Sequence, residues 1–117
     1  MLPKENRLKK RIAFKATYRT GISFYQDGIT VFCGKKKSDD YATKIGFVVS
    51  KKIHKRAVRR NRIKRLMRES VRLFIKNSEN FDTEYISLIF VASSKLLNKN
   101  FKDVDFAIKK LMRKINA

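Results

Sequence analysis

Residues 56–72, RAVRRNRIKRLMRESVR, combine a dense run of arginine and lysine with a regular spacing of apolar side chains. When these residues are placed on a helix, at about 100° per residue, the apolar and small side chains fall on one side. That side holds Ile63, Leu66, Met67, Ser70 and Val71, and Phe74 continues it just beyond the quoted stretch. The segment therefore predicts an amphipathic helix over residues 56–76, which packs on a sheet through one side and leaves a cationic side free.

The opposite side of this predicted helix carries a stripe of polar and basic residues. The stripe consists of Asn61, Lys64, Arg65, Arg68 and Arg72, with Arg60 and Arg62 at its borders. Residues 51–72 include 11 basic residues and only Glu69 as an acid. Because the planar guanidinium group can hold two phosphate oxygens at once, the stripe favours a polyanion as partner over a merely solvated helix face.

Sequence patterns on both sides of this helix predict a small α+β domain. A helix is expected over residues 10–20, because Phe14 and Tyr18 are four positions apart and Gly21 follows. Strand patterns occupy ISFYQ (22–26), GITVFCG (28–34), KIGFVVS (44–50) and YISLIFVA (85–92), and helical spacing returns in FKDVDFAIKKLMRKIN (101–116), with Asn100 as N-cap. The predicted order is α-β-β-β-α-β-α, with a small four-stranded sheet packed by helices.

Length and charge set the scale of the molecule and the nature of its partner. The 117 residues suit a single domain over residues 1–117, with residues 1–6 expected to be flexible. The formal net charge is +20, and residues 1–72 hold 22 basic and 5 acidic side chains. An anionic partner is therefore expected to face the first two thirds of the chain. The apolar runs are too short to span a bilayer, and the single cysteine, Cys33, suits a reduced, cytoplasmic protein.

The sequence holds no set of residues typical of catalysis or of metal binding. The one histidine, His54, lies among basic residues, and no Ser/His/Asp set, Cys/His cluster or glycine-rich phosphate loop is present. We therefore assign no catalytic residue and no metal ligand. Phe14, Tyr18 and Phe32 could stack on unpaired bases or pack in the core, and the residue pattern leaves both interpretations open.

The motif RNRIKRLMRES (60–70), preceded by SKKIHKRAV (50–58), resembles the bacterial ribonuclease P protein family. The opening RLKK (7–10), the helix with Phe14 and Tyr18, and the strand IGFVVSKK match the same family. The resemblance implies a protein that assists a catalytic RNA. That RNA, with Mg²⁺ held mainly by the RNA itself, would cleave precursor tRNA and release the 5′ leader.

The resemblance also implies partners and topology. The protein would bind the catalytic RNA subunit and precursor tRNA as a monomer, and its self-association in the absence of RNA is left open. The basic helix would lie in a left-handed strand-helix-strand crossover, against the usual handedness. Nothing in composition or periodicity indicates that crossover.

The resemblance assigns residues to each RNA. The catalytic RNA would contact Lys51, Lys52, Arg56, Arg60, Asn61, Arg62, Lys64, Arg65, Arg68 and Arg72. The leader would lie in a cleft lined by Phe14, Tyr18 and Phe32. Residues 53–58, IHKRAV, stand where many members have a Gly-Asn pair, so contacts made by that pair do not transfer.

Two other classes of protein share part of this pattern. A basic ribosomal or general RNA-binding protein, with no role in cleavage, would have the same composition. It would lack the combination of SKK, RNRIKR and the helix with Phe14 and Tyr18. A DNA-binding regulator would need a helix-turn-helix pair and usually a dimer surface, and the sequence indicates neither.

Overall fold

The computed structural model describes residues 2–37, 42–77 and 83–115. Its elements are η1 (Lys4–Asn6), α1 (Arg11–Arg19), β1 (Ile22–Gln26), β2 (Ile29–Cys33), β3 (Lys44–Val48), α2 (Ala57–Asn77), β4 (Ser87–Ala92), η2 (Ser94–Leu96) and α3 (Phe101–Ile115). With the two short 3₁₀ turns set aside, this order confirms the predicted α-β-β-β-α-β-α arrangement. The helices predicted over 10–20 and 56–76 differ from α1 and α2 by one residue at each end.

The sheet has the strand order β1-β2-β4-β3. The β1–β2 and β2–β4 pairs are antiparallel, whereas β3 and β4 are parallel. Asp27 and Gly28 join β1 to β2 with φ of 46° and 92°, a conformation that suits a two-residue hairpin turn. The central strand β4 contains Leu88 and Phe90, which point to the opposite face from Ile89, and all three are fully buried. Strand β4 is therefore covered on both faces.

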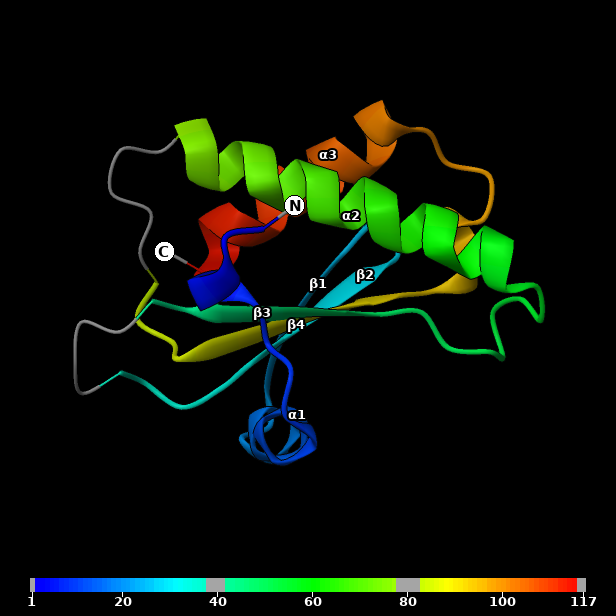
Figure 1. The fold of residues 1–117 in the computed structure, drawn as a ribbon. Helices are drawn as coiled ribbons and strands as arrows, with labels where there is room; N and C mark the ends of the chain where they lie inside the picture. Colours follow the sequence, from blue (N-terminus) through cyan, green and yellow to red (C-terminus); the bar gives the residue numbers. More distant parts are fainter. Residues whose placement is uncertain (1, 38–41, 78–82, 116–117) are drawn as a thin grey trace.

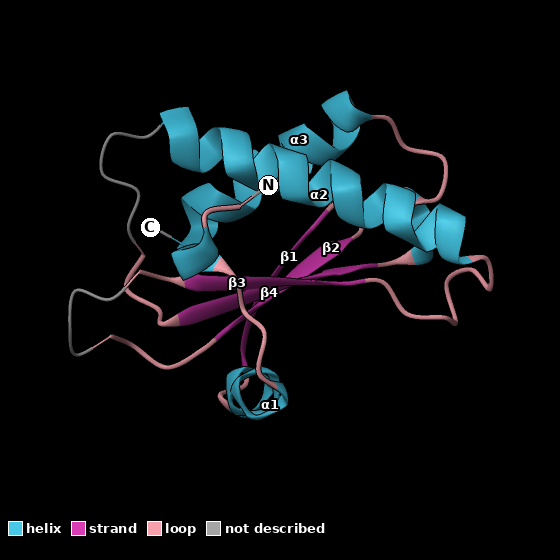
Figure 2. Ribbon diagram, viewed as in Figure 1, coloured by secondary structure: helices cyan, strands magenta, loops and turns pink. Residues whose placement is uncertain are grey.

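Helices cover both faces of the sheet. Figures 1 and 2 show α2 and α3 on one face and α1 on the other. The main core lies between the sheet and the α2–α3 pair, and it includes Ile29, Val31, Leu88, Phe90, Met67, Val71, Val104, Ile108, Leu111 and Met112. The predicted apolar side of α2 is thus confirmed, and its polar member Ser70 donates a hydrogen bond to Asp105 Oδ1 on α3 (2.7 Å).

The connection from β3 through α2 to β4 follows a left-handed path. In Figure 1, β3 lies in front of β4, and the chain runs rightward along β3, returns through α2 above the sheet, and runs rightward again along β4. The chain therefore turns anticlockwise as it moves away from the viewer. This agrees with the crossover that the resemblance implies and departs from the right-handed rule.

The N-terminal segment lies beside β3. Arg7 forms a parallel bridge with Ile45, and the N–H of Leu8 donates to the carbonyl oxygen of Ile45 (2.9 Å). The side chain of Asn6 donates to the carbonyl oxygen of Thr43 (2.9 Å). The flexibility of residues 1–6 stays a prediction. In the described part of the chain, every helix is too short or too polar to cross a membrane.

Helix α1 rests on the sheet through a glycine. A Cβ atom at Gly46 on β3 would lie 2.7 Å from Cζ and 2.8 Å from Cε1 of Phe14. The missing side chain therefore lets the Phe14 ring approach the strand. On the same helix, the hydroxyl of Thr17 lies 2.6 Å from the hydroxyl of Ser87 on β4 and donates to the carbonyl oxygen of Ala13.

We expect Gly46→Ala to lower the free energy of unfolding by about 1 kcal/mol. The added methyl group displaces the Phe14 ring, and the cost of that displacement exceeds the stability that alanine gains over glycine in a strand. Urea unfolding measures this loss. In a Phe14→Leu background the loss should shrink, since the ring is gone. An equal loss in both backgrounds would show that the ring is not what the methyl group meets.

Candidate nucleic-acid interface

The cationic side of α2 faces solvent along much of its length. Asn61, Arg65 and Arg68 are exposed, and they lie on the opposite side of the helix from the buried Ile63 and Met67. Within the described residues, the side chains of Lys64 and Arg65 form no hydrogen bond or ion pair. These cationic groups are therefore available to phosphate groups, which bind guanidinium and ammonium ions strongly.

Two arginines of the RNR motif also hold the protein together. Nη1 of Arg60 donates to the carbonyl oxygens of His54 (2.9 Å) and Lys55 (2.8 Å), in the loop before the helix. Nη2 of Arg62 donates to the carbonyl oxygen of Lys99 (3.0 Å), in the loop before α3. Both side chains thereby fix the connections at the start of α2 and α3, a role that sequence reasoning did not assign.

The loop between β3 and α2 presents further basic groups. Lys51, Lys52 and Arg56 are exposed there. Nδ1 of His54 accepts a hydrogen bond from the backbone N–H of Arg56 (3.1 Å) at the start of the helix. The histidine is thus engaged in shaping the loop.

Arg72, the last member of the predicted stripe, is paired with an acid. Its Nε and Nη2 donate to the two carboxylate oxygens of Glu69, at 3.0 and 2.6 Å. These hydrogen bonds lower the pKa of the Glu69 carboxyl below its ordinary value. The solvent-facing positive charge of the stripe is consequently concentrated on Lys64, Arg65 and Arg68.

We expect Glu69→Gln to raise the affinity of the protein for a structured RNA by roughly twofold to fivefold, because it removes an acid from the stripe and releases Arg72. Filter binding at several salt concentrations measures the change. Arg72→Ala in the Glu69→Gln background should cancel the gain. If the gain survives that second substitution, Arg72 is not the group that was released.

The three aromatic residues predicted to stack on bases come together under α1. Phe14 lies over Gly46, and the rings of Tyr18 and Phe32 meet edge to face with their centroids 5.0 Å apart. Gly46 on β3 and Phe32 on β2 both pair with Ile89 on β4. The helical turn from Phe14 to Tyr18 therefore crosses these three strands. Partial burial raises the pKa of Tyr18, and its phenol therefore stays a neutral hydrogen-bond donor near neutral pH.

The next row of the sheet continues this surface. Val48, Val91 and Thr30 are paired across the same three strands, point to the same face as Phe32, and are only partly buried. Sequence reasoning did not select them, because alternation alone identifies a face but not which strands lie side by side. We call Val48, Val91 and Thr30 the open sheet surface.

A hollow of about 330 Å³ lies between Phe14, one of the three aromatic residues under α1, and the cationic side of α2. It is lined by Phe14 and Gly46 below the sheet edge, and by Phe47 and Arg68 above it. The guanidinium carbon of Arg68 lies 5.9 Å from the centroid of the Phe47 ring, a cation–π contact. Lys9 of the N-terminal segment also lines the hollow. The two predicted sites are therefore parts of one surface around the β3 edge.

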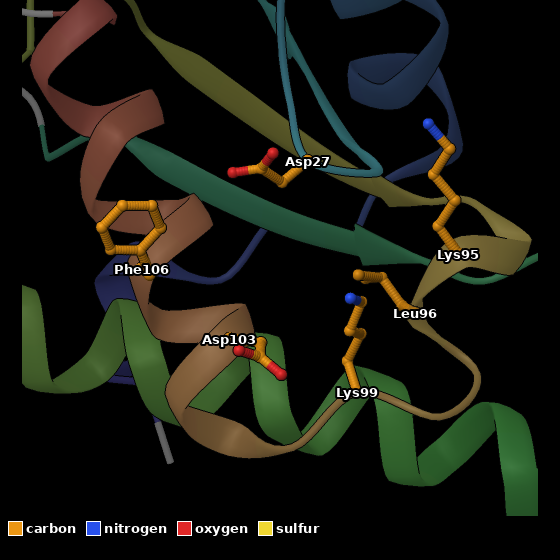
Figure 3. Close-up of a pocket in the computed structure, with 6 residues that line it drawn as sticks. All are labelled: Asp27, Lys95, Leu96, Lys99, Asp103 and Phe106. Carbon is orange, nitrogen blue, oxygen red and sulfur yellow. The ribbon is translucent and has the colours of Figure 1, made fainter.

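A second hollow, of about 400 Å³, has a different character. Figure 3 shows that it lies between the turn after β1 and the first half of α3. Its charged lining residues are two acids and two lysines, namely Asp27, Asp103, Lys95 and Lys99. Because these charges balance, this hollow does not extend the cationic surface.

The described residues offer no gathering of three or more His, Cys, Asp or Glu side chains placed to hold a metal ion.

Cys33 is completely buried, and burial raises the pKa of its thiol to about 12. The thiol is therefore protonated and shielded at neutral pH. Cys33 acts as a small core residue.

Comparison with known proteins identifies the family. The family model described as Ribonuclease P matches residues 2–116. The ribonuclease P protein component of Clostridioides difficile is 36% identical over 107 residues, which cover 92% of this chain and 89% of the relative. That of Clostridium novyi is 32% identical over 113 residues, covering 97% and 96%. The solved RNase P protein of Thermotoga maritima has a TM-score of 0.75 and 26% identity, covering 95% and 98%. The resemblance seen in the sequence is confirmed, and the chain belongs to the ribonuclease P protein family.

Proposed function

We propose that this chain is the protein subunit of a ribonuclease P, which binds the catalytic RNA and the 5′ leader of precursor tRNA. The observation that carries the proposal is the hollow at the β3 edge, where Phe14 and Arg68 line one cavity. Arginine side chains suit the phosphates of a folded RNA, and aromatic rings suit unpaired bases. One protein surface can therefore hold a structured RNA and a single strand next to each other.

In this proposal the catalytic RNA contacts the basic loop and the cationic side of α2. Lys51, Lys52 and Arg56 extend the charge of Lys64, Arg65 and Arg68 toward the loop. Asn61 adds a donor and an acceptor for 2′-hydroxyl groups or base edges. Arg60 and Arg62 contribute mainly by fixing the loops that orient this surface, since their guanidinium groups already bind backbone carbonyls.

In this proposal the leader lies against α1 and the open sheet surface, which together we call the leader site. Tyr18 and Phe32 offer ring faces and edges, while Val48 and Val91 supply an apolar floor. A leader held here enters beside the bound catalytic RNA, so the protein lowers the entropic cost of bringing substrate and RNA together.

The RNA subunit performs the hydrolysis in this proposal, and Mg²⁺ bound mainly to that RNA supplies the charge stabilisation. The protein contributes binding and orientation, acts as a monomer with its RNA, and works in the cytoplasm. Its +20 charge supports this division of labour, because it offsets phosphate repulsion between two RNA molecules.

Reconstitution tests the proposal directly. The purified protein is mixed with a catalytic RNA and a precursor tRNA at low Mg²⁺, and release of the 5′ leader is followed on a gel. We expect the protein to accelerate cleavage and to tighten substrate binding. Unchanged cleavage and unchanged substrate affinity would reject the proposed function in favour of general RNA binding.

A further inference from the structure

A pocket of about 500 Å³ lies on a different side of α1 from Phe14 and Tyr18. Ala13 and Ala16 of α1 form one wall, and Leu8 and Ile86 contribute further apolar surface. Its volume falls within the range of pockets that hold small organic groups, roughly 300–1,000 Å³. The leader site proposed above does not use this pocket, because Phe14 and Tyr18 lie on a neighbouring side of the helix and do not line it.

The polar groups around the pocket are engaged with one another. The hydroxyls of Thr17 and Ser87 lie 2.6 Å apart, and the hydroxyl of Thr20 donates to the carbonyl oxygen of Cys33. The N–H of Ile86 donates to the carbonyl oxygen of Lys35 (3.0 Å). Because these polar groups already have hydrogen-bond partners, the walls favour a flat, largely apolar group. For the same reason they discriminate weakly among groups of similar shape.

The rim of the pocket is strongly basic. Lys35 and Lys44 line the pocket itself, and Lys44 also lines an adjoining basin of about 590 Å³. That basin adds Lys4, Lys9 and Lys10. Glu5 lines both the pocket and the basin, and it is the one acid among their described lining residues. All five lysines are exposed, and within the described residues none forms a side-chain ion pair or hydrogen bond. An apolar pocket surrounded by ammonium groups complements a flat ring attached to phosphates.

We propose that this pocket holds one unpaired nucleobase of an RNA strand, with the adjacent phosphates bound by Lys35, Lys44 and the lysines of the basin. The proposal rests on the function given above, since an RNA partner must supply the strand. A single strand fits because a base in a duplex is stacked and cannot turn into the pocket. Binding is expected to tolerate any base, as the walls offer shape and few free hydrogen-bonding groups.

Ala16 permits a direct test, because it is exposed on α1 and lines the pocket. The affinity of the protein for a fluorescent oligouridylate is measured by anisotropy, in the wild type and in a Phe14→Ala background that weakens the leader site. Ala16→Leu and Ala16→Glu should each weaken binding by at least about fivefold, the lower end expected for one stacked base. Ile12→Glu, on an exposed position of the same helix outside the pocket, is the charge-matched control.

Wild-type affinity in the Ala16→Leu variant would overturn the proposal, as would an equal loss in Ile12→Glu and Ala16→Glu. Thermal unfolding of each variant confirms that the fold is retained. Lys35→Ala combined with Lys44→Ala should reduce the salt dependence of binding by about 0.7 log–log units per lost phosphate contact. Lys102→Ala combined with Arg113→Ala removes the same charge from α3 and should leave the affinity much closer to wild type.

The source of the strand is distinguished in the reconstituted holoenzyme. If the leader supplies the base, Ala16→Leu weakens binding of a precursor with a full leader and spares one with a truncated leader. If the catalytic RNA supplies it, the variant weakens the protein–RNA complex whatever the leader. No loss in either complex would overturn the proposal. The oligouridylate assay needs no cleavage, so its outcome is separate from success or failure of the proposed function.

Discussion

Replacing Arg65 and Arg68 together with alanine is expected to weaken binding of the catalytic RNA by roughly a hundredfold or more. Each charge-assisted hydrogen bond to phosphate contributes about 1.5–3 kcal/mol, and both side chains are exposed on the solvent-facing side of α2. The slope of log affinity against log salt should also become shallower, by up to about 0.9 units per lost phosphate contact, taking duplex DNA as the guide. Filter binding over a range of salt concentrations measures both quantities.

A charge-matched control separates this contact from a general loss of positive charge. Lys102→Ala with Arg113→Ala removes two exposed cations from α3 that are not among the predicted RNA-contacting residues. It should cost far less affinity. Because Arg68 also contacts the ring of Phe47, thermal unfolding of the Arg65/Arg68 variant must show an intact fold. An unchanged salt slope in a folded variant would mean that these two side chains do not reach phosphates.

The sequence predicted the elements well because each has a strong local pattern. The apolar spacing from Ile63 to Phe74 identifies α2, and the same spacing identifies its solvent-facing side. Asn100 accepts a hydrogen bond from the N–H of Asp103 (3.0 Å), as expected of an N-cap. These features depend on residues a few positions apart, which is the range that periodicity reports.

Long-range features escaped the sequence pattern for an equally physical reason. The parallel pairing of Phe47 with Phe90 joins residues far apart in the chain, and strand alternation does not specify a neighbour. The hollow that Phe14 shares with Arg68 depends on that pairing. Likewise, Arg62 donates to the backbone carbonyl oxygen of Lys99. Because every residue has such a carbonyl, side-chain chemistry cannot indicate which one Arg62 binds. The net charge of the chain predicted an anionic partner. Only the strand order shows that the cationic and aromatic sites lie next to each other.

Replacing Phe14 with alanine is expected to reduce the preference of the holoenzyme for precursor tRNA over mature tRNA. Stacking on one base contributes about 1–3 kcal/mol, so the loss should lie between roughly fivefold and a hundredfold. The ring is partly exposed, lines the hollow beside Gly46 and Arg68, and so can meet a strand that enters from the α2 side. Affinities for tRNA with and without a leader, measured with the same holoenzyme, give the preference.

Two further variants decide whether Phe14 binds RNA or only packs. Phe14→Leu keeps an apolar group over Gly46 but removes the ring, so it should retain most of the stability while still losing leader preference. Phe106→Ala removes an exposed ring from α3, which lies on the opposite face of the sheet from α1 (Figure 1), and should leave the preference unchanged. Equal losses of affinity for tRNA with and without a leader in Phe14→Ala would assign the ring to packing. In that case Tyr18 and Phe32, whose rings contact each other under the same helix, would be the remaining aromatic contacts to the leader.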